Sequence, residues 1–173
     1  FCCAADLAPV SDCQLHWITG PLDAAAGGKA LGLSKLAGWG LRVPPAFVLV
    51  HPESDSLPAT LADYYKELGA GKVAVRSSAI GEDGASSSFA GLYETVLDVE
   101  GMPALGSAIE QCLESLHSAR ADAYQDSNAV NAAHMSVVVQ RMVDASVAGV
   151  LFTVDPVSGR HDRLVIDAVS GLG

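Results

Sequence analysis

Two isolated cations stand beside glycine- and serine-rich segments in an otherwise acidic chain. Lys29 follows Gly27 and Gly28, and the N–H groups of a helix N-terminus together with an ammonium group are donors that phosphate oxygens prefer. Arg76 ends the apolar run that begins at Val73 and leads into a serine-rich segment. A guanidinium can bind an anionic group through two parallel hydrogen bonds. These residue types favour binding of a small phosphorylated ligand.

Each of the two segments also has a purely structural interpretation. The turn before Lys29 departs from a Walker A loop, because Asp23 stands where that motif has its first glycine and Ala30 where it has Ser or Thr. A glycine turn that starts an amphipathic helix explains the same residues. A surface ion pair explains Arg76. Taken one at a time, the two segments leave both interpretations open.

Further polar residues are candidates for ligand binding. Glu82 and Asp83 offer carboxylate oxygens of the kind that Mg²⁺ prefers, although loop solvation or turn capping accounts for them as well. Gln140 closes an apolar run, and Met142 just beyond it can pack on a flat heterocycle; an ordinary core strand is the alternative. The sequence has no Ser/His/Asp or H-E-x-x-H arrangement, so we expect no histidine to act as a catalytic base.

The elements that must position these residues alternate between helix and strand, which predicts an α+β (α/β) domain. Apolar residues at helical spacing and the glycine and proline stops between them predict helices over about 30–37, 58–68 and 103–124. Short apolar runs predict strands over 47–50, 72–77 and 92–99, with a small, polar loop at 78–91. Three β-branched runs at 135–143, 147–154 and 164–169 predict a C-terminal antiparallel β meander.

Composition excludes several classes of partner. The 173 residues carry 20 acidic against 10 basic side chains, a net charge of −10, which opposes extended contact with nucleic acid or anionic lipid. No run approaches the ~20 apolar residues that span a bilayer. The first ten residues contain Asp6 and no basic leader, unlike a signal peptide. Four cysteines without C-x-x-C spacing favour reduced thiols in a cytoplasmic protein.

In their order along the chain, these motifs resemble the N-terminal ATP-binding domain of phosphoenolpyruvate synthases, rifampicin phosphotransferases and, more distantly, pyruvate phosphate dikinases. Phosphoenolpyruvate synthase is the branch that they resemble most. Four stretches carry the resemblance: 27–48, 75–83, 88–95 and 139–173. It implies an ATP-grasp fold, in which ATP lies between two α+β lobes. An N-terminal extension would cover 1–20 and a partial nucleotide-binding domain 21–173, with the first lobe at about 21–130 and the start of the second at about 131–173.

The resemblance also implies roles for individual residues. Lys29 would contact the phosphates, and Arg76 would neutralise charge at the transferred phosphoryl group, so both are the catalytic candidates. A flap and its base would consist of Ser88, Ala90, Gly91, Glu94 and Thr95, and the adenine-binding hinge would include Gln140, Met142 and Val143. No metal ligand is assigned, because Mg²⁺ would be held mainly by residues that follow Gly173 in the family. Ser87 and Leu92, which flank the flap core, depart from the family's Ala and Gln.

The implied activity is transfer of a phosphoryl group from ATP to a histidine on a separate domain, towards formation of phosphoenolpyruvate from pyruvate. A phosphohistidine domain and a pyruvate-binding domain would then be partners within a longer protein, and this chain alone would be inactive. Two alternatives stay open: the ATP-binding part of a rifampicin phosphotransferase, and a truncated, non-catalytic nucleotide-binding module.

Overall fold

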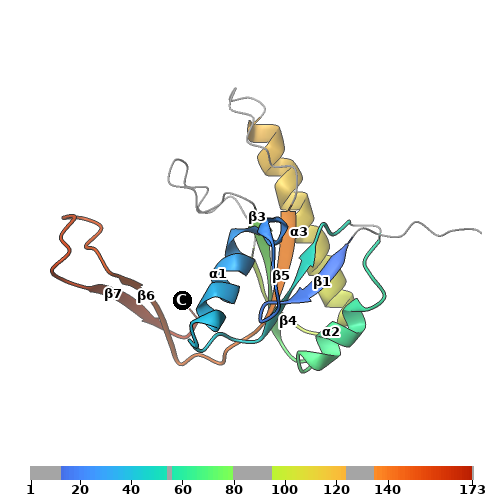
Figure 1. Cartoon of the computed structure of the whole chain (residues 1–173), viewed down its shortest axis with the longest axis horizontal. Coiled ribbons are helices and arrows are strands. Elements are labelled where there is room, and N and C mark those ends of the chain that lie inside the picture. The colour runs from blue at the N-terminus through green and yellow to red at the C-terminus, as the bar shows by residue number, and fades with distance from the viewer. Residues whose placement is uncertain (1–12, 54–55, 80–94, 124–134, 173) are drawn as a thin grey trace, which may run out of the picture. The chain divides into compact units, whose positions relative to one another are not determined.

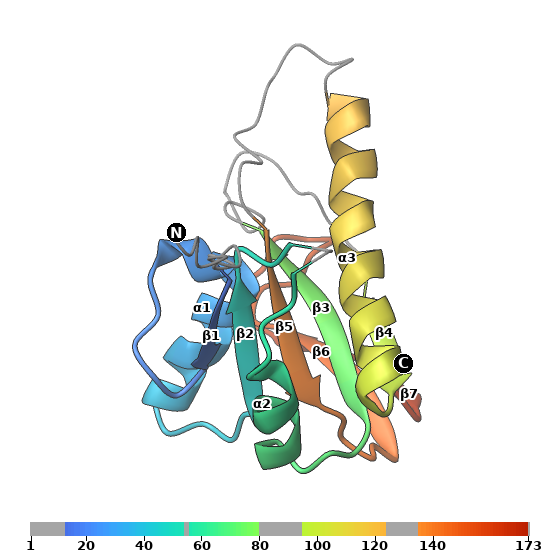
Figure 2. The ribbon, with the colours of Figure 1, turned by 90° about the vertical axis from the view of Figure 1, so that its right-hand side faces the viewer.

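A computed structural model describes residues 13–53, 56–79, 95–123 and 135–172 (Figure 1). The chain falls into two compact units that divide between Met142 and Val143. The first unit is a five-stranded sheet with helices on both faces, and the second is a two-stranded hairpin. Figure 2 shows the sheet of the first unit with its strands side by side.

Five strands form the sheet of the first unit in the order β1-β2-β5-β3-β4, and every neighbouring pair is antiparallel. The strands are β1 (Gln14–Trp17), β2 (Ala46–Val50), β3 (Val73–Ala79), β4 (Thr95–Val99) and β5 (Met135–Arg141). β5 lies in the centre although it is the last of the five in the chain. Its register places Val138 opposite both Val48 of β2 and Arg76 of β3.

The predicted C-terminal meander is wrong, because its first strand belongs to the central sheet. Only β6 (Val147–Phe152) and β7 (Val165–Ser170) pair with each other. The apolar run of β5 is buried from Ser136 to Gln140, which is the environment of a strand covered on both faces. β5 thus joins the first unit, although the second lobe implied by the resemblance starts at about 131. β1 was not predicted at all, since its four residues carry too short a pattern.

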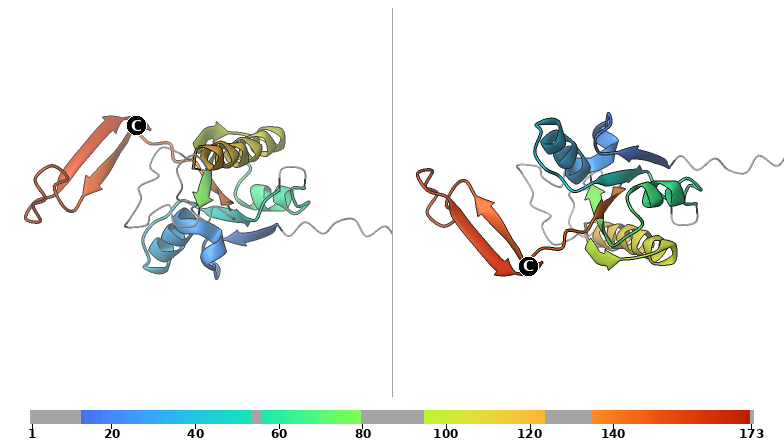
Figure 3. Two further views of the ribbon diagram at one scale, coloured as in Figure 1. Left: turned by 90° about the horizontal axis from the view of Figure 1, so that it is seen from above. Right: turned by 90° about the horizontal axis from the view of Figure 1, so that it is seen from below.

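Helices cover the two faces of the sheet unequally (Figure 3). On one face lies α1 (Gly27–Gly38), preceded by the 3₁₀ turn η1 (Ala24–Ala26). On the other lie α2 (Leu61–Glu67) and α3 (Met102–Ala123). All three predicted helices are confirmed, with ends within about three residues of the expected ones. Within the described segments, no helix is both long and apolar enough to cross a membrane.

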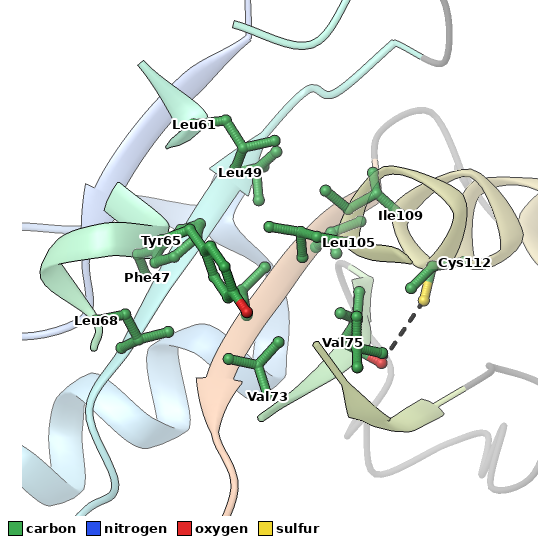
Figure 4. Close-up of a cluster of buried hydrophobic side chains, with 14 of the residues drawn as sticks. Phe47, Leu49, Leu61, Tyr65, Leu68, Val73, Val75, Leu105, Ile109 and Cys112 are labelled. Atoms are coloured by element: carbon green, nitrogen blue, oxygen red, sulfur yellow. Dashed lines mark hydrogen bonds between the residues drawn. The ribbon is translucent and has the colours of Figure 1, made fainter. Parts of the chain in front are cut away.

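The main hydrophobic core fills the space between the sheet and the α2 and α3 helices (Figure 4). Alternate residues of the central strands point into it, as the period of two in a strand requires. Its fully or almost fully buried members include Phe47, Leu49, Val73, Val75, Leu105 and Ile109. Each such side chain contributes roughly 1.5–3 kcal/mol to stability through removal of apolar surface from water.

A second, smaller core lies on the opposite face, beneath α1. Val48 and Val138 of the sheet meet Ala26 and Ala30 of η1 and α1 there, and all four are almost completely buried. Because alanine side chains are small, the N-terminal turn of α1 approaches the strands closely. That close approach sets the geometry of the candidate site.

The second unit is held together by its hairpin pairing and by its connecting loop. Asp155 caps this loop: its carboxylate accepts hydrogen bonds from the Ser158 hydroxyl at 2.5 Å and from the Val157 amide at 2.9 Å. These hydrogen bonds lower the pKa of Asp155, and the bond from the Ser158 hydroxyl has the largest effect. Arg160 pairs with Asp162 in the same loop.

Candidate functional site

Lys29 lies in the first turn of α1, and its ammonium reaches the sheet. Nζ donates a hydrogen bond to the backbone oxygen of Ser77 in β3 at 2.9 Å. The side chain is half-buried. A lysine near a helix N-terminus is therefore held at the end of β3, where the helix dipole and the ammonium add two positive contributions.

Gly27 explains why the turn before Lys29 is rich in glycine. A Cβ atom built on Gly27 would lie 2.3 Å from the backbone oxygen of Ser78 and 2.5 Å from its Oγ, and Gly27 has a φ of +80°. Glycine alone tolerates both the close approach and this backbone conformation. Gly27 thus serves the packing of α1 onto β3, whatever ligand the turn binds.

Arg76 lies on the same face of the sheet as α1. Side chains alternate along a strand, and the register partner of Arg76 on β5 is Val138, which packs in the core beneath α1. The half-buried guanidinium donates to Oε1 of Gln140 at 3.5 Å, and Gln140 Nε2 donates in turn to the Pro44 oxygen at 3.4 Å. Since Gln140 is neutral, this contact orients the guanidinium without cancelling its charge.

The face that carries Arg76 also includes two more of the predicted residues. Gln140 is opposite Ala74, two residues before Arg76, and only 8% of its surface is exposed. Thr95 is the register partner of Arg76 on β4 and is exposed. The fold therefore brings Lys29, Arg76, Thr95 and Gln140 to one face of the sheet, from four separate elements.

The candidate site has two ends along the β3–β5 pair. The Lys29 end lies at Ser78, whose register partner is Ser136. Gln140 lies four residues further along β5, about 13 Å away at the rise of an extended strand. Beyond it, the half-buried Met142 donates its N–H to the Lys72 oxygen at 3.0 Å. The two ends thus differ in their donors: the Lys29 ammonium at Ser77, and the Arg76 guanidinium with the Gln140 amide at the other end.

Several predicted residues are not brought into this site by the described structure. Val143 is the first residue of the second unit, so its side chain is not placed relative to Gln140. The flap residues Ser88, Ala90, Gly91 and Glu94, together with Glu82 and Asp83, lie outside the described residues. Among the residues that the structure does describe, no group of three or more His, Cys, Asp or Glu side chains could hold a metal ion.

Two site residues were missed by sequence reasoning, the buried serines Ser78 and Ser136. Both are completely buried, and both form hydrogen bonds to the turn that carries Lys29. The available signal was a serine inside an otherwise apolar strand at Ser136. The sequence does not connect Ser136 with the Ala25 oxygen to which it donates, because the two residues lie 111 positions apart.

Comparisons with known proteins cover most of the chain. Residues 48–173 match the family model of the pyruvate phosphate dikinase AMP/ATP-binding domain. The chain is similar to phosphoenolpyruvate synthase of Aeropyrum pernix, with 32% identity over 201 residues that cover 85% of this chain and 24% of the relative. It is also similar to rifampicin phosphotransferase of Streptomyces sviceus, with 45% identity over 102 residues that cover 58% of this chain and 12% of the relative.

A third relative differs in its name from both of these. The chain is 37% identical over 179 residues to the prodigiosin synthesizing transferase PigC of Serratia marcescens, which covers 85% of this chain and 20% of that protein. The chain thus spans about a quarter or less of the length of these three relatives. Arg76 and Gln140 lie inside the family match, and Lys29 precedes it.

Proposed function

Because this chain belongs to the pyruvate phosphate dikinase AMP/ATP-binding domain family, we propose that ATP binds on the α1 face of its five-stranded sheet, with Lys29 and Arg76 as the phosphate ligands. One observation carries this proposal. Two of the few cations of an acidic chain come from different elements, α1 and β3, and lie on the same face of the sheet.

The chemistry of this face suits a polyphosphate. The N-terminus of α1 places the positive end of the helix dipole at this face, while the amides of Gly27 and Ala30 are bonded to the Ala24 oxygen and to Ser78 Oγ. The Lys29 ammonium and the Arg76 guanidinium add full charges. Phosphoryl transfer demands mainly positioning and stabilisation of the negative charge that moves during the reaction. These two residues would do both.

At the other end of the site, Gln140, Met142 and Val143 would form the adenine-binding hinge. Met142 offers a polarizable side chain that can pack on a flat ring. Ser88, Ala90, Gly91, Glu94 and Thr95 would cover the phosphates as a flap, and Thr95 lies beside Arg76 in the register. Mg²⁺ would accompany the ATP, with its carboxylate ligands supplied outside the described residues.

In the complete reaction, a phosphoryl group from ATP would pass to a histidine on a separate domain, towards formation of phosphoenolpyruvate from pyruvate. The similarity to a phosphoenolpyruvate synthase supports this assignment. The 45% identity to a rifampicin phosphotransferase supports a second candidate, in which the same ATP-binding face serves transfer to rifampicin. In both cases this chain would form the first of two ATP-grasp lobes and the start of the second, within a cytoplasmic protein. A non-catalytic nucleotide-binding module is the third candidate.

Isothermal titration calorimetry with Mg-ATP tests the nucleotide site directly. Lys29→Ala and Arg76→Ala should each weaken binding about 10- to 100-fold, the range expected for loss of a hydrogen bond to a charged group. Lys72→Ala is the matched control, because Lys72 is exposed and pairs with Asp98 at 3.1 Å. The affinity of this variant for Mg-ATP should stay within about twofold of wild type. Failure of the wild-type chain to bind, or equal affinities in all variants, would refute the site.

Acceptor transfer separates the three candidates. The longest natural chain would be incubated with Mg-ATP labelled in its β- or its γ-phosphoryl group and with either pyruvate or rifampicin. Label in phosphoenolpyruvate, with a histidine-bound intermediate that is labile to acid, supports the first candidate. Label in rifampicin supports the second, and ATP binding without any transfer supports the module.

A further inference from the structure

We propose that Ser78 and Ser136 are positioning residues. They hold residues 24–30, the turn formed by η1 and the start of α1, against the sheet and thereby aim the Lys29 ammonium at the ligand. The two serines are direct register partners in β3 and β5. Both are completely buried on the face that α1 covers. The aim towards a ligand rests on the proposed function, whereas the anchoring of the turn stands on the geometry alone.

The two hydroxyl groups bind successive carbonyl groups of the turn. Ser136 Oγ donates to the Ala25 oxygen at 2.7 Å, and Ser78 Oγ donates to the Ala26 oxygen at 2.9 Å. A strand pair thus contacts two consecutive residues of η1 at the point where α1 begins. Such a double contact fixes both the position and the direction of the chain that enters the helix.

Ser78 also holds the far side of the Lys29 turn. Its Oγ accepts a hydrogen bond from the Ala30 amide at 3.2 Å, so a single hydroxyl joins the residues before and after the Gly27–Lys29 segment. The amide of Ala30 is the fourth of α1, so this bond ties the end of the first helical turn to β3. The side chain of Lys29 itself contacts the backbone of the preceding residue in β3, Ser77.

This arrangement goes beyond filling space in the core. The hydroxyl groups bond backbone atoms of Ala25, Ala26 and Ala30, and alanine at 78 or 136 would fill nearly the same volume as serine. The main contribution of the hydroxyl groups is therefore to fix the orientation of the turn relative to β3. Without Ser78 Oγ, the buried amide of Ala30 and the oxygen of Ala26 lose these partners, and the turn can rotate relative to β3.

Amide hydrogen exchange of the nucleotide-free chain tests the anchoring independently of ATP. Ser78→Ala and Ser136→Ala should each raise exchange rates at residues 27–30 about tenfold or more, with smaller changes in α3. Ser115→Ala is the matched control, because it removes a hydroxyl that donates to the Cys112 oxygen at 2.7 Å, on the other side of the sheet. If exchange at 27–30 is unchanged in both serine variants, the proposal fails.

Ligand selectivity tests the aim of the ammonium. The serine variants should bind Mg-ATP about tenfold more weakly, while their affinity for adenosine, which has no phosphate, stays within about twofold of wild type. Equal losses for both ligands would indicate general destabilisation and would overturn the positioning role. If the wild-type chain binds no ATP, the proposed function fails, and the exchange rates still decide the anchoring. Ser136→Ala decides both readouts if Ser78→Ala does not fold.

Discussion

The guanidinium of Arg76 donates a hydrogen bond to the side-chain oxygen of Gln140 at 3.5 Å, across 64 residues of sequence. The side-chain amide nitrogen of Gln140 donates to the oxygen of Pro44 at 3.4 Å. Pro44 lies just before the start of β2. Gln140 therefore links the central strand of the sheet to both of its neighbours. Both functional groups of its side chain are engaged within the protein, which suits a residue that orients Arg76.

A double-mutant cycle measures this orientation. Gln140→Ala should weaken Mg-ATP binding about three- to tenfold, less than Arg76→Ala, because Arg76 keeps its charge but loses its neighbour. In the Arg76→Ala background, the same change at Gln140 should have little further effect, since residues in contact are not additive. Calorimetry on the four chains gives the coupling. Gln14→Ala on the edge strand β1, where Gln14 is exposed, is the control.

Additive effects of the two substitutions would contradict the orienting role. In that case the adenine-binding hinge proposed above would be the only role left for Gln140.

Two glycines of α1 should respond to alanine in opposite directions. Gly27→Ala should destabilise the fold by about 2–5 kcal/mol, because the new Cβ would overlap the backbone of Ser78 and Gly27 has positive φ. Gly32→Ala should stabilise it by about 0.5–1 kcal/mol, since no heavy atom lies within 4 Å of its Cβ position and alanine is the better helix former. Urea unfolding of the three chains measures both changes. A mild effect at Gly27 would mean that α1 sits further from β3 than described.

Cys13 should make stability sensitive to alkaline pH. Burial, with a smaller effect of the Glu53 carboxylate, raises the pKa of this thiol to about 11, whereas an unfolded cysteine has a pKa of about 8.5. The folded chain thus favours the neutral thiol. This contribution is fully present below pH ~8.5 and is lost as the pH rises from there towards 11, because the unfolded chain releases the proton first.

To isolate this effect, the free energy of unfolding would be measured for wild type and for Cys13→Ala at several pH values from about 7 to 11. Other groups titrate in both chains and cancel in the difference. We expect the wild type to lose stability more steeply than the variant above pH ~8.5. Parallel curves would show that the thiol ionises freely in the folded state.

Local sequence patterns were sufficient for the helices and for most strands. The spacing of Leu33, Leu36 and Ala37 and the proline pair that follows predicted α1, and a run of valines predicted β5. Such patterns work because a helix or strand buries one or both faces of its own residues, and the period is visible within about ten positions. The two cations of the candidate site were found in the same way, from their immediate neighbours.

The patterns did not show which elements lie side by side. A run such as Val137–Val139 indicates burial on both faces of a strand, but it contains no information on the strands that flank it, and so β5 was placed in a meander. The contacts of Ser136 with Ala25 and of Arg76 with Gln140 depend on that order. Residue chemistry and periodicity thus identified the parts of the site, whereas strand order and packing, which arise from contacts distant in sequence, brought those parts to one face.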